Sequence, residues 1–168
     1  MYHYWTNKGL HRSHRCFMIQ EKEVTATRYR NDRHKAIANF LFTYSNVASR
    51  LQKLLSEHRL SVQQFNILRI LQRQYPKPSC NCTIRKQMLD ARSDITRIVD
   101  RLVKDGLAVR KNCSDDRRKV NITITQKGLA LLARMDPLND KMDGIMGCLT
   151  DDEVAELNRI LDKIRNHS

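Results

Sequence analysis

The most constraining feature of this chain is a charged cluster that lies between two candidate β-strands. The segment "CSDDRRKVNITIT", residues 113–125, places two aspartates beside three consecutive basic residues and then alternates β-branched apolar residues with polar ones. Strict alternation of this kind predicts a strand with one buried face. The segment before it, "LAVRKN", residues 107–112, predicts a second strand. Together they predict a two-stranded β-ribbon with a charged turn at its tip.

Amphipathic helices are expected before this ribbon. An apolar stripe with helical period begins near Arg33 and ends near Leu55. A second helix is expected to start at Ser61, which forms a capping-box pattern with Gln64. The prolines of "YPKP" cannot continue that helix and are expected to end it.

Two shorter helices are expected next. Thr83 can cap a helix over residues 84–89, and Asp90 can cap another over residues 91–105. Gly106 follows, at a position where a left-handed residue commonly ends a helix.

Helices are also expected after the ribbon. "TQKG" leads into a long helix that Pro137 should bend. Thr150 and Glu153 form a second capping-box pattern, which starts the last helix.

The net charge of +13 is distributed unevenly along the chain. Residues 77–128 hold 13 basic and 6 acidic residues, whereas residues 129–168 hold 5 basic and 8 acidic residues. The basic excess therefore coincides with the ribbon and the helices before it. This placement favours a polyanionic partner, and double-stranded DNA fits the elements expected there.

The order of elements over residues 61–125 is typical of a helix-turn-helix followed by a β-ribbon, which is a winged helix. We expect a mainly α fold with a small β-wing, framed by N- and C-terminal dimerisation helices that pair two copies of the chain. The expected organisation is an N-terminal extension without clear periodicity over 1–30, a dimerisation helix over 31–57, a winged helix-turn-helix DNA-binding domain over 58–128 and C-terminal dimerisation helices over 129–168.

The helix expected over residues 91–105 has a polar face that suits the DNA major groove. An α-helix fits this groove, and the residues near its N-terminus reach base edges. Arg97 is the candidate for a guanine contact, and Asp94 is expected to cap the helix or form a local ion pair, with a cytosine contact as the alternative. Taken by itself, the same face could simply be solvated. The candidate DNA contacts of this helix are Ser93, Thr96, Arg97 and Arg101.

The charged turn is the second candidate contact with DNA. Asp116 and Arg118 are two residues apart and can pair, which would hold the planar guanidinium in one geometry. A narrow minor groove carries enhanced negative potential and attracts such an arginine. Arg117 and Lys119 then remain for phosphate oxygens. The alternative is an exposed ion pair that contributes only about 0–1 kcal/mol.

These motifs resemble those of a known family. "DRRKVNITITQKG", residues 116–128, resembles the wing signature of the multiple-antibiotic-resistance regulator (MarR) family, with Ile124 in place of a leucine. "ITRIVDRLVKDGLAVR", residues 95–110, is similar to the family's recognition helix and the strand after it. The resemblance implies a homodimeric transcriptional regulator, usually a repressor that a small ligand or oxidation releases from a pseudo-palindromic operator. It also implies that Arg118 is the minor-groove residue and Asp116 its partner.

Two other functions remain as alternatives. A winged helix can serve as a protein–protein interaction module without specific DNA binding. An RNA-binding module is the other, but single-stranded RNA readers expose aromatic residues for base stacking, and aromatic residues make up only 6% of this chain.

Aromatic and cysteine side chains are the candidates for a switch. Some relatives bind aromatic ligands in a cleft between the dimer helices and the reading domain, and core packing is the alternative role of such residues. The candidate lining consists of Phe40, Tyr44 and Phe65. Cys80, Cys82 and Cys113 lie near the expected ribbon and could respond to oxidation, or they could be incidental free thiols.

No catalytic pattern, glycine-rich phosphate loop or metal-binding motif is recognisable, so we expect neither an enzyme nor a bound cofactor or metal. The Cys80-x-Cys82 spacing is not that of zinc knuckles. No apolar run reaches the roughly 20 residues of a membrane span, and no signal peptide is recognisable. The expected location is therefore the cytoplasm.

Overall fold

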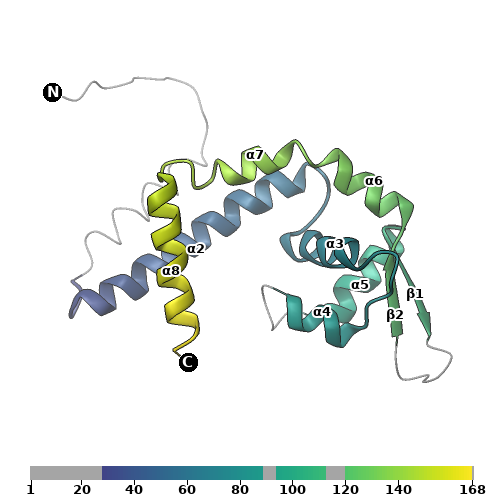
Figure 1. Cartoon of the computed structure of the whole chain (residues 1–168), viewed down its shortest axis with the longest axis horizontal. Helices are drawn as coiled ribbons and strands as arrows, with labels where there is room; N and C mark the ends of the chain where they lie inside the picture. The colour runs from purple at the N-terminus through teal and green to yellow at the C-terminus, as the bar shows by residue number, and fades with distance from the viewer. Residues whose placement is uncertain (1–27, 89–93, 113–119, 168) are drawn as a thin grey trace. The chain divides into compact units, whose positions relative to one another are not determined.

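The computed structural model describes residues 28–88, 94–112 and 120–167. It divides into one unit that ends at Asn46 and a second that begins at Val47, and the first helix starts in one unit and ends in the other. Figure 1 labels the elements along the chain. They are α2 (Asp32–Ser56), α3 (Val62–Gln74), α4 (Asn81–Gln87), α5 (Ile95–Lys104), β1 (Ala108–Asn112), β2 (Val120–Ile124), α6 (Gln126–Arg134), α7 (Leu138–Asp143) and α8 (Asp151–Arg165).

The element order confirms the expected fold class, a mainly helical chain with a small antiparallel ribbon. Helix α3 has the predicted capping box: the Ser61 hydroxyl accepts from the Gln64 N–H at 3.1 Å, and the Gln64 side chain accepts from the Ser61 N–H at 2.9 Å. The helix ends at Gln74, directly before "YPKP". Over the described residues, no helix is long and apolar enough to cross a membrane.

Helix α4 corrects one prediction. The helix begins at Asn81 instead of residue 84, and its cap is Cys80 rather than Thr83. The Cys80 sulfur accepts from the Thr83 N–H at 3.3 Å and lies 3.2 Å from the Thr83 hydroxyl. These hydrogen bonds lower the pKa of the Cys80 thiol. The bond with the Thr83 hydroxyl has the larger effect, and the bond from the Thr83 N–H has the next largest. In the segment before this helix, Ser79 is the one residue that pairs with a strand. Its N–H donates to the Ile122 carbonyl and its carbonyl accepts from the Ile122 N–H, both at 2.8 Å.

The ribbon forms as predicted. Its strands pair antiparallel, with Ala108 opposite Ile124 at one end and Asn112 opposite Val120 at the other. Gly106 lies in the left-handed region with φ +72° and ends the preceding helix. The side chains of Ile122 and Ile124 are buried, as the alternation in β2 predicts.

After the ribbon, the chain forms two helices where one bent helix was expected. Pro137 does not bend a continuous helix. Helix α6 ends at Arg134, and Pro137 is the N-cap residue of α7. Proline lacks the N–H that a continuing helix requires, which is the physical reason for this break. The last helix, α8, has the predicted capping box between Thr150 and Glu153.

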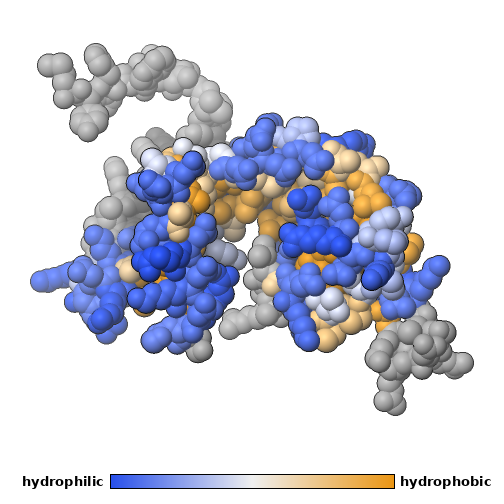
Figure 2. All heavy atoms as spheres, viewed as in Figure 1, coloured by the Kyte–Doolittle hydropathy of each residue, from blue (hydrophilic) through white to orange (hydrophobic). Residues whose placement is uncertain are grey.

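The hydrophobic core lies where α3, α5 and the ribbon meet. The side chains with 0% exposure are Ile67, Leu68, Ile84, Val99, Leu102 and Ile122. Hydrophilic side chains dominate the face shown in Figure 2. Some large apolar side chains nevertheless remain exposed. They are Ile37, Phe40, Leu41 and Tyr44 of α2, Ile160 and Ile164 of α8, and also Tyr75, Val109 and Met146.

We predict that Gly128→Ala destabilises the fold by about 3 kcal/mol, because the added methyl group overpacks the join between α6 and the ribbon. A Cβ at Gly128 would lie 2.4 Å from the Leu107 carbonyl oxygen and 2.7 Å from Cγ1 of Ile124. Gly106→Ala is the control: its Cβ would meet nothing closer than 3.7 Å, so only the left-handed backbone strain of about 1–2 kcal/mol applies. Urea unfolding measures both free energies, and an equal or smaller loss for Gly128→Ala would contradict the close packing.

Candidate nucleic-acid interface

Helix α5 is the helix expected over residues 91–105, and we call it the reading helix. It begins later than the sequence predicts: it starts at Ile95, and its cap is Asp94, whose Oδ1 accepts from the Arg97 N–H at 3.1 Å. This bond confirms the capping role expected for Asp94 and is of a kind that typically contributes about 1 kcal/mol. Asp90, the predicted cap, and Ser93, a predicted DNA contact, lie outside the described residues.

The apolar side of α5 determines which side chains face solvent. Ile95, Val99 and Leu102 are at most 1% exposed and pack into the core. Because these positions repeat with the helical period, the opposite side of the helix must point outward. That side consists of exposed residues, and they include three of the predicted DNA contacts, Thr96, Arg97 and Arg101.

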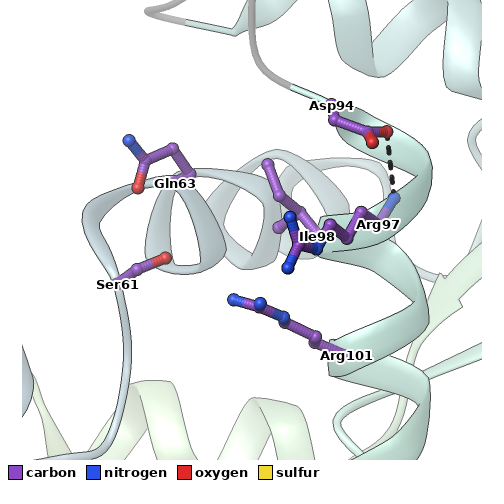
Figure 3. A pocket seen from close by; sticks show the side chains of 6 residues that line it. All are labelled: Ser61, Gln63, Asp94, Arg97, Ile98 and Arg101. Atoms are coloured by element: carbon purple, nitrogen blue, oxygen red, sulfur yellow. Dashed lines mark hydrogen bonds between the residues drawn. The ribbon is translucent and has the colours of Figure 1, made fainter.

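Two of these contacts lie around a hollow between α5 and the N-terminal turn of α3. Figure 3 shows the guanidinium groups of Arg97 and Arg101 pointing from α5 toward Ser61 and Gln63. The hollow has a volume of about 300 Å³. Among the described residues, no carboxylate forms an ion pair with Arg97 or Arg101. Asp94 also lines the hollow, where its carboxylate caps α5 and does not pair with either arginine. The two unpaired guanidinium groups suit an anion such as a backbone phosphate.

The sequence analysis did not identify the contribution of α3 to this hollow. Ser61 was singled out as a helix cap, but a cap pattern does not say which other element lies beside the helix start. Only the packing of α3 against α5 brings Ser61 and Gln63 near the two arginines.

An ion pair connects the reading helix to the ribbon. Nη1 of Arg110 in β1 lies 2.7 Å from Oδ1 of Asp100 in α5. The Arg110 side chain is 30% exposed and that of Asp100 is 55% exposed, so the pair contributes at most about 1 kcal/mol to stability. Its effect is geometric, because it joins the outer face of α5 to the strand that leads to the ribbon tip.

The predicted tip residues lie outside the described residues. Asp116, Arg117, Arg118 and Lys119 belong to the segment 113–119 that joins β1 to β2. The strands on either side of it are paired up to Asn112 and Val120. The predicted pairing of Asp116 with Arg118 therefore stays a prediction.

The candidate switch residues are placed in different surroundings. Phe40 and Tyr44 are 53% and 63% exposed on α2. Phe65 is half-buried against the core, with the Arg69 guanidinium 6.0 Å from its ring centre. Cys80 is half-buried, whereas Cys82 is exposed, and both are free thiols.

The described part of the chain has no cluster of three or more histidine, cysteine, aspartate or glutamate side chains that could hold a metal ion. Cys113 and the histidines of the first 27 residues are not described.

Comparison with known proteins identifies the family. The MarR family model matches residues 60–120. The transcriptional regulator PecS of Dickeya dadantii is 30% identical over 120 residues, which are 70% of this chain and 72% of PecS.

Solved structures agree with this assignment at the level of the fold. A cysteine-to-serine mutant of MarR from Escherichia coli, complexed with operator DNA, has a TM-score of 0.72 at 23% identity, over 82% of this chain and 99% of that one. BpsR of Bordetella bronchiseptica, whose DNA binding is regulated by 6-hydroxynicotinic acid, has a TM-score of 0.69 at 23% identity, over 77% and 98%. PecS is named as a transcriptional regulator, and the other two are described by their DNA binding. The chain, with its winged helix-turn-helix and exposed reading helix, therefore belongs to the MarR family of DNA-binding transcriptional regulators.

Proposed function

We propose that this protein is a homodimeric repressor that binds a pseudo-palindromic operator and is released from it by a small aromatic ligand. The observation that carries the DNA part is the outward face of α5, where Arg97 and Arg101 converge beside the start of α3 without a carboxylate partner among the described residues. Two such faces, related by a two-fold axis, would match the symmetry of a palindromic site.

In this proposal α5 enters the major groove. Thr96 and Arg97 lie in its first turn and reach base edges, with Arg97 donating to a guanine. Arg101 lies one turn further and neutralises a phosphate, and Ser93 contacts DNA just before the helix.

The ribbon supplies the second part of the proposed contact. The pairing of Asn112 with Val120 supports a tip formed by the segment 113–119. There Arg118, positioned by Asp116, enters the flanking minor groove, while Arg117 and Lys119 bind phosphate oxygens.

The proposed domain organisation follows the sequence boundaries. Residues 31–57 and 129–168 form the dimerisation helices around the DNA-binding domain over 58–128, and residues 1–30 are an extension. The support is a set of exposed apolar side chains that a monomer leaves in water, whereas a second copy can cover them. On α2 they are Ile37, Phe40, Leu41 and Tyr44, at 53–63% exposure, and on α8 they are Ile160 and Ile164, at 41% and 61%.

An aromatic ligand is the proposed releasing signal. The regulation of BpsR by 6-hydroxynicotinic acid supports a ligand of this class. Aromatic side chains can stack on such a ligand, and the candidates remain Phe40 and Tyr44, which are exposed, and Phe65, which is half-buried with the Arg69 guanidinium over its ring. Oxidation is the alternative signal, with Cys80 as the thiol of lowered pKa.

We predict that Arg97→Ala weakens binding to the DNA upstream of the protein's own gene by roughly 5- to 150-fold, because a bidentate guanine contact contributes about 1–3 kcal/mol of discrimination. Mobility-shift titration against that DNA and a scrambled duplex measures affinity and specificity. Lys141→Ala, on exposed α7, removes the same charge as a control. Equal operator affinity for the two variants would contradict the assignment of Arg97.

Asp100→Asn is predicted to lower operator affinity by about 2- to 5-fold, although removing a negative charge should by itself favour DNA. Losing the 2.7 Å ion pair weakens the connection between β1 and α5. The expected loss is at most the contribution of about 1 kcal/mol of such a partly exposed pair. The matched control is Asp143→Asn, on exposed α7, which should leave affinity unchanged or slightly raised. Unchanged or higher affinity for Asp100→Asn would disprove the positioning role.

Replacing an exposed apolar residue of α8 tests the dimer. We predict that Ile164→Asp shifts sedimentation velocity from a dimer toward a monomer and weakens operator binding by at least 10-fold, because a carboxylate cannot be buried unpaired in an apolar interface. Asn158→Asp adds the same charge at another exposed position on this helix and should stay dimeric. A wild-type protein that sediments as a monomer at micromolar concentration would rule out this assembly.

A further inference from the structure

A second hollow lies away from the reading face, at the base of the ribbon. Its walls come from the loop between α2 and α3, from the end of α5 and from α6, and its volume is about 530 Å³. This volume falls within the roughly 300–1,000 Å³ of small-molecule sites. We call it the basal hollow. Its charged lining consists of Arg59, Lys104, Lys127, Arg134 and Asp105, together with His58.

The charge of the basal hollow is strongly one-sided. Four permanent cations face one carboxylate, that of Asp105. Lys127 is held by a backbone group, since its Nζ donates to the Asp105 carbonyl at 2.7 Å. Among the described residues, Arg59, Lys104 and Arg134 have no ion pair or side-chain hydrogen bond.

Two arginines of helix α8, by contrast, are neutralised by carboxylates of the same helix. Arg159 pairs with Glu156 at 2.7 Å, and Arg165 pairs with Asp162, each within one helical turn. Within the described residues, none of the four cations of the basal hollow forms such an ion pair, although the Asp105 carboxylate lies among them. Cations gathered in a concave surface reinforce one another's potential and favour binding of an anion.

The hollow also has an apolar floor. Leu60 and Leu107 are 3% and 5% exposed, and Leu131 is half-buried beside them. An apolar floor lowers the local dielectric constant, which strengthens attraction between a bound anion and the cations around it. It also offers a surface for the uncharged part of an organic ligand.

The position of the basal hollow separates it from the proposed DNA contacts. Strand β1 begins directly after Leu107 and runs through five residues, about 16 Å, toward the ribbon tip. Along α5, Lys104 lies seven residues, about 10 Å, beyond Arg97. The basal hollow therefore lies at the end of these elements that is distant from Arg97 and from the ribbon tip, although Arg101, the proposed phosphate contact, is only three residues from Lys104.

We propose that the basal hollow is a binding site for a small polyanion, such as the phosphate groups of a phosphorylated metabolite. Arg59 and Arg134 supply planar, bidentate donors, and Lys104 and Lys127 supply two ammonium groups. An occupant competes with the Asp105 carbonyl for Lys127, so its binding affects Asp105, the residue that directly follows α5.

Pyrophosphate is the probe for this site. Titration of the full-length protein, followed by calorimetry and amide NMR at ionic strength held constant with sodium chloride, should show saturable binding with shifts at Asp105 and Gly106. The double variant Lys104→Gln/Arg134→Gln should weaken binding at least 10-fold. Lys77→Gln/Lys141→Gln removes the same charge at exposed positions elsewhere and should change it less than 2-fold.

Three results would overturn the proposal. The first is the absence of saturation, and the second is equal weakening in both double variants, which would indicate a general field effect. The third is a loss of operator affinity in Lys104→Gln/Arg134→Gln as large as that of Arg97→Ala, which would make the hollow a DNA contact. Circular-dichroism melting checks that the variants are folded. The single variant Lys127→Gln is a milder test, and it should weaken pyrophosphate binding at least 3-fold.

Discussion

Burial of one side of α5 is the constraint on which the DNA-binding surface depends. Each large aliphatic side chain removed from water contributes about 1.5–3 kcal/mol, and Ile95, Val99 and Leu102 are almost completely buried. Rotating the helix about its own axis would bring charged residues into the core and expose these three. Arg97 and Arg101 are four residues apart and therefore share the opposite side. The outward position of the arginines is thus a consequence of core packing.

The ribbon is held against this helix by contacts on several sides. Strand β2 pairs with β1 along one edge and, at Ile122, with the backbone of Ser79 on the other. The ion pair between Asp100 and Arg110 then connects β1 to the outer face of α5. A reading helix and a wing can act on one duplex only if their separation is constant, and these contacts restrict it.

Local chemistry made much of the fold predictable from the sequence. The capping boxes at Ser61 and Thr150, the left-handed Gly106 and the alternation in β2 each depend on residues within a few positions of one another. The start of α4 was missed because a cysteine sulfur, a weak acceptor outside the usual capping set, takes that role at Cys80. The start of α5 was placed too early because Asp90 and Asp94 offer equivalent cap patterns.

The candidate site was only partly predictable, for a different reason. The amphipathic pattern of α5 indicated that Thr96, Arg97 and Arg101 face outward, and they do. The Asp100–Arg110 pair and the basal hollow join elements that are distant in sequence, so no local pattern predicts them.

The distance between the DNA-facing arginines and the basal hollow affects how anions bound at the two places interact. Arg97 and Lys104 lie about 10 Å apart along α5, which exceeds the Debye length of about 8 Å at physiological salt, so direct repulsion between them is largely screened. Arg101 lies only about 5 Å from Lys104 along the helix, so anions bound at the two basic regions are not fully independent of each other.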